Sequence, residues 1–241
     1  MFSKFKEKLK NWAKKISKTK AKEIKEDKLV TRTMQIEAWA LENKKSLTYV
    51  VVGVVALAVL LFVWRGRVAT AEEEAATRLA NIMSVYDAGS WQDAIDGVPS
   101  QGKQFRLRSI AEEYGGTVAG EFSKLFYATA LTNLLRYEEA LRVYEDIDHD
   151  DRLITASRES GQGICLEALG RYAEAAKAFE RAAGEDPQNP LAPDRLVMSA
   201  RNYGKAGNPE QARDVLETLR KQYPTSAYAR DVDRYLAEFA S

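Results

Sequence analysis

Residues 161–190, GQGICLEALGRYAEAAKAFERAAGEDPQNP, carry the pattern from which the architecture of the chain can be worked out. Small and bulky residues alternate at fixed intervals, at Gly163, Leu166, Gly170, Tyr172, Ala175, Phe179, Ala182 and Pro187. Small residues let two helices approach closely, and aromatic side chains fill the space between them. Gly170 permits a tight turn, and Pro187 ends the second helix. The stretch therefore predicts a pair of antiparallel helices.

The same pattern occurs again on both sides of this stretch. It recurs 35 residues earlier at Ala128, Leu131, Leu135, Tyr137, Ala140, Tyr144 and Ile147. It recurs 37 residues later at Ala200, Tyr203, Gly207, Ala212, Leu216, Leu219 and Pro224. A degenerate copy lies upstream at Ile82, Val85, Gly89, Trp91 and Ala94. One helix pair cannot bury its apolar face alone, whereas about three stacked pairs form a stable solenoid.

This spacing resembles that of the tetratricopeptide repeat. The resemblance implies an all-α protein in which residues 65–241 form a solenoid of about three clear repeats plus the degenerate first one. We expect a single capping helix near the C-terminus, in SAYARDVDRYLAEFAS. We also expect a short helix around Ile110 and Tyr114, and one long helix that runs from the apolar stretch described next towards Gly89. Such repeats are general protein-binding scaffolds, so the resemblance is informative about fold and much less about function.

The two ends of the chain have opposite charge. Residues 1–46 contain 14 Lys and Arg against 6 Asp and Glu, whereas the remainder contains 22 against 29. Between them lies the uncharged stretch SLTYVVVGVVALAVLLFVW, residues 46–64, which as a helix is about 28 Å long and could cross a bilayer. We therefore predict a transmembrane helix over residues 47–64, with a buried core helix as the alternative. A cleaved signal peptide would require a much shorter basic region before the apolar stretch.

The distribution of basic residues predicts the orientation in the membrane. Lys and Arg flanking a span tend to remain in the cytoplasm, so residues 1–46 should be cytoplasmic. Residues 65–241 would then be periplasmic in a bacterium, and the chain would be a single-pass protein of the inner membrane.

The first 20 residues predict a basic amphipathic helix. Five apolar residues recur at steps of 3 and 4, and lysines fill most of the gaps: Phe2, Phe5, Leu9, Trp12 and Ile16. Such a helix could lie on the cytoplasmic leaflet of the lipid bilayer, dock into a groove of a partner protein, or remain solvated. Lysines without a recognised nucleic-acid module do not indicate a nucleic-acid partner.

The whole arrangement resembles a family of bacterial inner-membrane proteins with one N-terminal span and a periplasmic tetratricopeptide domain, the YfgM-like ancillary subunits of the SecYEG translocon. The resemblance rests on the span, on IAEEYGGTVAGEFSKLFYATALTNLLRYEEAL, on the repeat at residues 161–190 and on YPTSAYARDVDRYL. It implies that the translocon and periplasmic chaperones are partners. The basic N-terminal helix is longer than the cytoplasmic tail usual in that family.

Residues that could carry chemistry are few. Cys165 is the single cysteine and is predicted to be a small buried side chain in a helix. His149 is the single histidine and lies in DIDHDD, which we interpret as a solvated turn, since cation-binding loops need spaced oxygen ligands and a glycine bend. We predict no catalytic residues, no metal, no cofactor and no small-molecule substrate, and hence no enzyme.

The inner face of the solenoid is the predicted binding groove, because the first helix of each repeat lines it. The repeat register assigns to this groove Leu125, Thr129, Thr132, Asn133, Ser160, Ile164, Glu167, Val197, Arg201 and Lys205. A segment of another protein could lie there. Two functions follow: a membrane-anchored scaffold associated with protein export and chaperones, or a structural subunit of another membrane complex. The alternative to the groove is that contacts with other proteins use another face of the solenoid.

Overall fold

The computed structural model describes Trp39 and residues 43–98 and 105–237. The predicted N-terminal amphipathic helix, with Phe2, Phe5, Leu9, Trp12 and Ile16, lies outside the described residues. The chain divides into two compact units, Met1–Arg65 and Gly66–Ser241. Helix α2 (Lys44–Asp87) contributes its first part to the N-terminal unit and its remainder to the C-terminal unit.

In the N-terminal unit, α2 carries the long apolar stretch. Every residue from Tyr49 to Trp64 is exposed, including Phe62 with 80% of its surface accessible. A buried core helix would be covered by other side chains, and the described part of the chain places none over this stretch. Among the described residues, α2 is the one helix long and apolar enough to cross a membrane, by length and composition.

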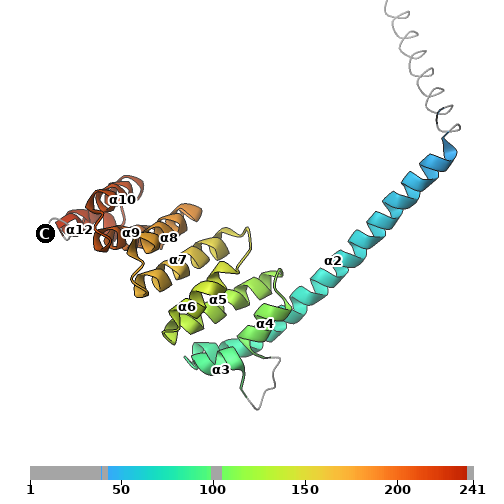
Figure 1. Ribbon diagram of the computed structural model, residues 1–241, viewed down its shortest axis with the longest axis horizontal. Coiled ribbons are helices and arrows are strands. Elements are labelled where there is room, and N and C mark those ends of the chain that lie inside the picture. Colours follow the sequence, from blue (N-terminus) through green and yellow to red (C-terminus); the bar gives the residue numbers. More distant parts are fainter. Residues whose placement is uncertain (1–38, 40–42, 99–104, 238–241) are drawn as a thin grey trace, which may run out of the picture. The chain divides into compact units, whose positions relative to one another are not determined.

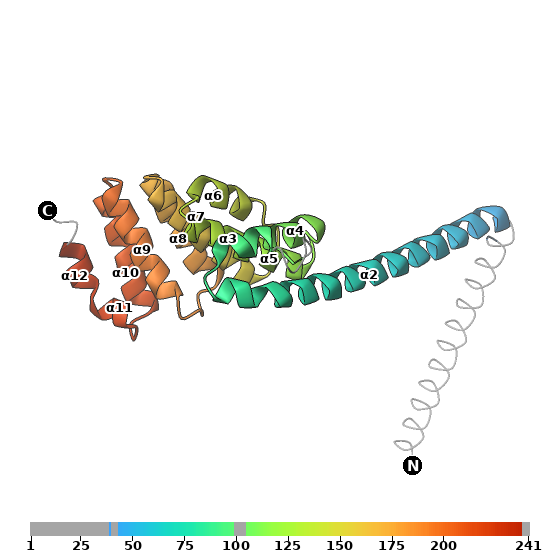
Figure 2. The same ribbon diagram turned by 90° about the horizontal axis from the view of Figure 1, so that it is seen from below.

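The C-terminal unit is helical, and the described residues contain no strand. Its core consists of three helix pairs stacked in chain order, as Figures 1 and 2 show. The pairs are α5 (Val118–Asn133) with α6 (Tyr137–Glu145), α7 (Arg152–Ala168) with α8 (Tyr172–Glu185), and α9 (Ala192–Lys205) with α10 (Pro209–Gln222). Three such pairs match the three predicted repeats, so the predicted α-solenoid is confirmed.

The turn inside each pair depends on one residue with a positive φ. Gly170 and Gly207 both adopt φ +75°, a conformation that glycine reaches without steric cost. The α5–α6 turn places Leu135 at the equivalent position, with φ +59°. Leu135 is the one non-glycine residue with positive φ in the described part of the chain.

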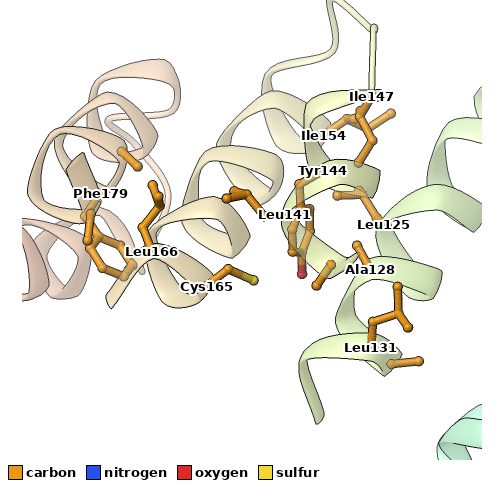
Figure 3. Close-up of a cluster of buried hydrophobic side chains, with 14 of the residues drawn as sticks. Leu125, Ala128, Leu131, Leu141, Tyr144, Ile147, Ile154, Cys165, Leu166 and Phe179 are labelled. Atoms are coloured by element: carbon orange, nitrogen blue, oxygen red, sulfur yellow. The ribbon is translucent and has the colours of Figure 1, made fainter. Parts of the chain in front are cut away.

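Close packing between neighbouring helices requires the predicted small residues. A Cβ atom at Gly163 would lie 2.8 Å from the ring of Phe179, and one at Gly161 would overlap the ring of Tyr144. Figure 3 shows Phe179 and Tyr144 projecting from α8 and α6 into the same cluster as Cys165 of α7. Cys165 is fully buried, as predicted.

The degenerate first repeat is shorter than a full helix pair. Its first helix is the last part of α2, where Ala75 and Ile82 are fully buried. Its second helix, α3 (Trp91–Asp96), has six residues and is followed by Gly97 at φ +87°. The predicted short helix is present as α4 (Leu107–Glu113).

The C-terminal cap differs from the single helix predicted for it. It consists of α11 (Ala227–Arg230) and α12 (Val232–Ala237), separated at Asp231. The break allows Ala229 of α11 and both Val232 and Tyr235 of α12 to be buried against the last repeat.

A buried carboxylate on α5 holds the loops on both sides of the α5–α6 pair. Glu121 is 1% exposed, and its two oxygens accept hydrogen bonds from the backbone N–H groups of Gly116 at 3.0 Å and Asp148 at 3.2 Å. Lys124 lies 3.1 Å from the same carboxylate and 2.9 Å from Asp146. Because Gly116 precedes α5 and Asp148 follows α6, this side chain fixes two loops at once.

Candidate interaction surface

The predicted groove residues lie on the three first helices, α5, α7 and α9, but they do not all reach solvent. Leu125 and Val197 are buried, with 8% and 2% of their surface accessible, so they do not line an open surface. Leu125 packs with Tyr144 in the central cluster (Figure 3), and Val197 belongs to the cluster that includes Tyr235 of the cap. Both residues lie on first helices, as the register assigns them, but their burial excludes them from an open groove.

The hydroxyl groups on α5 donate hydrogen bonds to backbone carbonyl groups of the same helix. Thr129 donates to the carbonyl of Leu125 at 2.8 Å, and Thr132 donates to that of Ala128 at 2.9 Å. The side-chain amide of Asn133 donates to Thr129 O at 3.0 Å. On α7, Ser160 donates likewise to Ala156 O at 2.7 Å. These side chains therefore have little hydrogen-bond donor capacity left for a partner.

Glu167 links the α7–α8 pair to the α9–α10 pair. Its carboxylate lies 2.5 Å from Lys205 Nζ and accepts a hydrogen bond at 3.0 Å from the side-chain amide of Asn202. Partial burial alone would raise the pKa of Glu167, but the hydrogen bonds from Asn202 and Lys205 outweigh it and lower the pKa below its ordinary value. Lys205 also lies over the ring of Tyr172, 5.5 Å from its centre.

Arg201 is engaged with the C-terminal cap. Its guanidinium lies 5.1 Å from the centre of the Tyr235 ring, which Arg234 also approaches, at 4.8 Å. Glu167 and Arg201, two charged residues of the predicted groove, therefore both take part in internal contacts. Ile164, with 41% of its surface accessible, is the predicted groove residue that presents an apolar side chain to solvent.

The acidic sequence DIDHDD forms the turn between α6 and α7. His149 Nδ1 accepts a hydrogen bond from the backbone N–H of Asp151 at 2.9 Å, and the Asp151 carboxylate accepts from the N–H groups of Leu153 and Ile154 at the start of α7. Within the described ranges, no group of three or more His, Cys, Asp or Glu side chains is arranged to hold a metal ion. Burial raises the pKa of the Cys165 thiol, which lies 3.5 Å from Thr132 Oγ1.

A hollow of about 680 Å³ lies on the side of the second helices and was not predicted. Ala183 and Gly184 of α8, Leu196 of α9 and Val215 of α10 contribute to its apolar lining. A Cβ atom at Gly184 would meet no atom within 4 Å. The only sign in the sequence is this glycine in the middle of a helical pattern, which by itself does not predict a hollow.

Comparison with known proteins agrees with this architecture. Residues 166–232 match the tetratricopeptide repeat family. Two crystal structures of a Podosopora anserina protein, described as a kinesin light chain with nearly identical TPR-like repeats, are similar to the chain, and one of the two is a single-residue variant. In both, the identity is 15% and the TM-score 0.50, over 68% of this chain and 83% of the other. No curated protein sequence matches significantly.

The fold is therefore that of a tetratricopeptide-like α-solenoid. Repeats of this class typically act as non-catalytic scaffolds that bind other proteins. The C-terminal unit of this chain has the architecture of such a scaffold.

Proposed function

We propose that the chain is a membrane-anchored scaffold whose solenoid binds other proteins. The observation that carries the proposal is the apolar part of α2, in which every residue from Tyr49 to Trp64 is exposed. Side chains of this kind are stable in hydrocarbon and costly in water. In this proposal residues 47–64 span the bacterial inner membrane, residues 1–46 are cytoplasmic, and residues 65–241 are periplasmic.

The proposed partners are the protein-export translocon and periplasmic chaperones. Support comes from the resemblance to the YfgM-like family and from the general role of the repeat. The exposed side chain of Ile164, between the engaged polar groups of α5 and α9, favours an apolar contact over recognition of a charged group. The N-terminal helix would lie on anionic lipid or dock onto a membrane partner.

The second candidate is a structural or accessory subunit of a different membrane complex. The internal engagement of Glu167 and Arg201 favours it, because a groove whose charges are satisfied internally has less to offer a soluble ligand. In this case the span and the N-terminal helix would hold the chain in the complex, and the solenoid would act as a spacer or cover.

Affinity purification from membranes in mild detergent separates the two candidates. The full-length chain is compared with a version that lacks residues 1–64, and bound proteins are identified by mass spectrometry. Translocon subunits and chaperones on the full-length chain, with chaperones alone on the truncated one, would support the export function. A stoichiometric set of other membrane subunits that is lost entirely on truncation would support the structural subunit.

Membrane topology is tested separately, by adding protease to spheroplasts. The proposal predicts that residues 65–241 are digested from outside while a tag on the N-terminus survives. Recovery of the full-length chain in the soluble fraction of broken cells would contradict the membrane anchor.

A further inference from the structure

Leucine is an unfavourable residue at position 135 for two reasons. Its backbone adopts φ +59°, where three equivalent turns use Gly89, Gly170 and Gly207 at φ +74° to +75°. Its side chain is 70% exposed, so it contributes little to packing. The turn needs a positive φ but not a leucine, so the choice of leucine at this strained position points to a role outside the molecule. Leu135 thus presents an isolated apolar side chain at the tip of the α5–α6 turn.

The hollow between α8 and α10 suits an apolar side chain such as that of Leu135. Its floor is apolar, since Leu196 and Val215 are buried residues that border it. Gly184 leaves it open, because no side chain projects into it from that position. Its volume of about 680 Å³ exceeds what a single leucine side chain fills.

Charges beside the two features are also complementary. Glu138 follows Leu135 by three residues, is exposed, and has no ion-pair partner among the described residues. Lys177 lies on the rim of the hollow, is exposed, and likewise has none within the described part of the chain. The neighbouring carboxylate on the rim, Glu180, accepts a hydrogen bond from Tyr203 OH at 3.1 Å. Lys177 is therefore available to an acidic group of a second molecule.

We propose that the chain associates with a second copy of itself through these features. Leu135 of one copy enters the α8–α10 hollow of the other, and Glu138 pairs with Lys177 across the contact. The contact gives a role to the strained leucine and to the hollow, neither of which the proposed membrane scaffold uses. It does not depend on membrane anchoring.

The test is sedimentation equilibrium of the full-length chain in a density-matched detergent, over a hundredfold range of concentration. We expect reversible association that is weakened about tenfold by Leu135→Asn, since asparagine keeps the left-handed backbone and removes the apolar anchor. We expect a similar loss from Gly184→Leu, which puts a side chain into the hollow from a position whose Cβ meets no atom within 4 Å. Neither variant should melt at a lower temperature than the parent chain, so that a loss of association cannot be attributed to unfolding.

Two controls identify the contact. Leu153→Asn removes another exposed leucine, 49% accessible and outside the contact, and should leave association unchanged. Glu138→Lys and Lys177→Glu should each weaken association, and the two together should restore it. A monomer throughout the concentration range, or association that neither Leu135→Asn nor Gly184→Leu weakens, would overturn the proposal.

Discussion

The carboxylate of Glu72 on α2 accepts a hydrogen bond from the backbone N–H of Ala119, in the first turn of α5, at 3.0 Å. Nearby, Arg78 of α2 lies 2.8 Å from Glu113 of α4 and over the ring of Tyr114. Together with the burial of Ile82, these contacts make the last part of α2 an integral helix of the solenoid. The helix that carries the predicted membrane span is thus continuous with one that the folded domain needs.

These contacts of α2 set the N-terminal boundary of the folded domain. We expect residues 66–241 to unfold cooperatively in urea, whereas residues 88–241 should lose at least about 3 kcal/mol of unfolding free energy, because Ile82 is removed from the core. Circular dichroism during urea titration measures both. Equal midpoints for the two fragments would show that α2 is dispensable for the fold.

Replacement of Glu121 by alanine should destabilise the domain by about 3 kcal/mol. The change leaves the N–H groups of Gly116 and Asp148 without their acceptor and removes one partner of Lys124. Urea titration of the variant provides the measurement. Glu112→Ala, at an exposed position on α4, is the matched control and should change stability by less than about 0.5 kcal/mol. Similar effects of the two substitutions would contradict a structural role for Glu121.

Two glycines in neighbouring helices should respond to alanine in opposite directions. Gly163→Ala forces a methyl group against Phe179 and should destabilise the domain by about 1–3 kcal/mol. Gly184→Ala meets open space and should stabilise it by about 0.5–1 kcal/mol, because alanine favours the helix. Thermal unfolding of both variants measures these changes. Melting temperatures that shift in the same direction in both variants would be inconsistent with the packing described.

The turn conformation predicts a second reciprocal pair. Gly170→Leu should lower the unfolding free energy by about 1 kcal/mol, since its Cβ meets no neighbour and the cost lies in the left-handed backbone alone. Leu135→Gly should raise it by a smaller amount, because glycine also gains freedom in the unfolded chain. Chemical denaturation compares the two variants, and a stabilising Gly170→Leu would refute the strain argument.

Glu167 should contribute a pH-dependent part of stability. Its pKa in the folded chain is lowered from the ordinary value of 4.5, so the carboxylate form stabilises the fold above that pH. The contribution is lost as the pH falls through the folded pKa. Glu167→Gln should therefore show a smaller loss of unfolding free energy than the parent chain between pH 7 and pH 3. Parallel pH profiles for the two proteins would mean that the Lys205 and Asn202 contacts do not favour the charged form.

The sequence predicted those parts of the fold that depend on steric necessity. Gly170 and Gly207 could be assigned to turns, and Gly163 to a close helix contact, because few other residues satisfy those geometries. Leu135 shows the limit of this rule, since it occupies a turn position that the other repeats assign to glycine. The break at Asp231 was not predicted, because the apolar periodicity continues across it.

The surface was harder to predict than the fold. Repeat register assigned Leu125 and Val197 to the inner face, but only the packing of neighbouring helices and the cap reveals that they are buried. The contacts of Glu167 with Lys205 and Asn202 join residues more than 30 positions apart, beyond the reach of local patterns. The hollow beside Gly184 arises from the spacing of three helices, which no single segment encodes.

The burial of Cys165 gives the chain an internal reporter of its own opening. A thiol with no accessible surface and a raised pKa reacts with alkylating reagents only when α7 separates from α5 and α6. Because Cys165 is the only cysteine, the rate of its modification isolates the motion of the middle repeat from that of the rest of the molecule. A protein that binds the solenoid and keeps it closed would then slow the alkylation of Cys165, although it does not contact the sulfur atom itself.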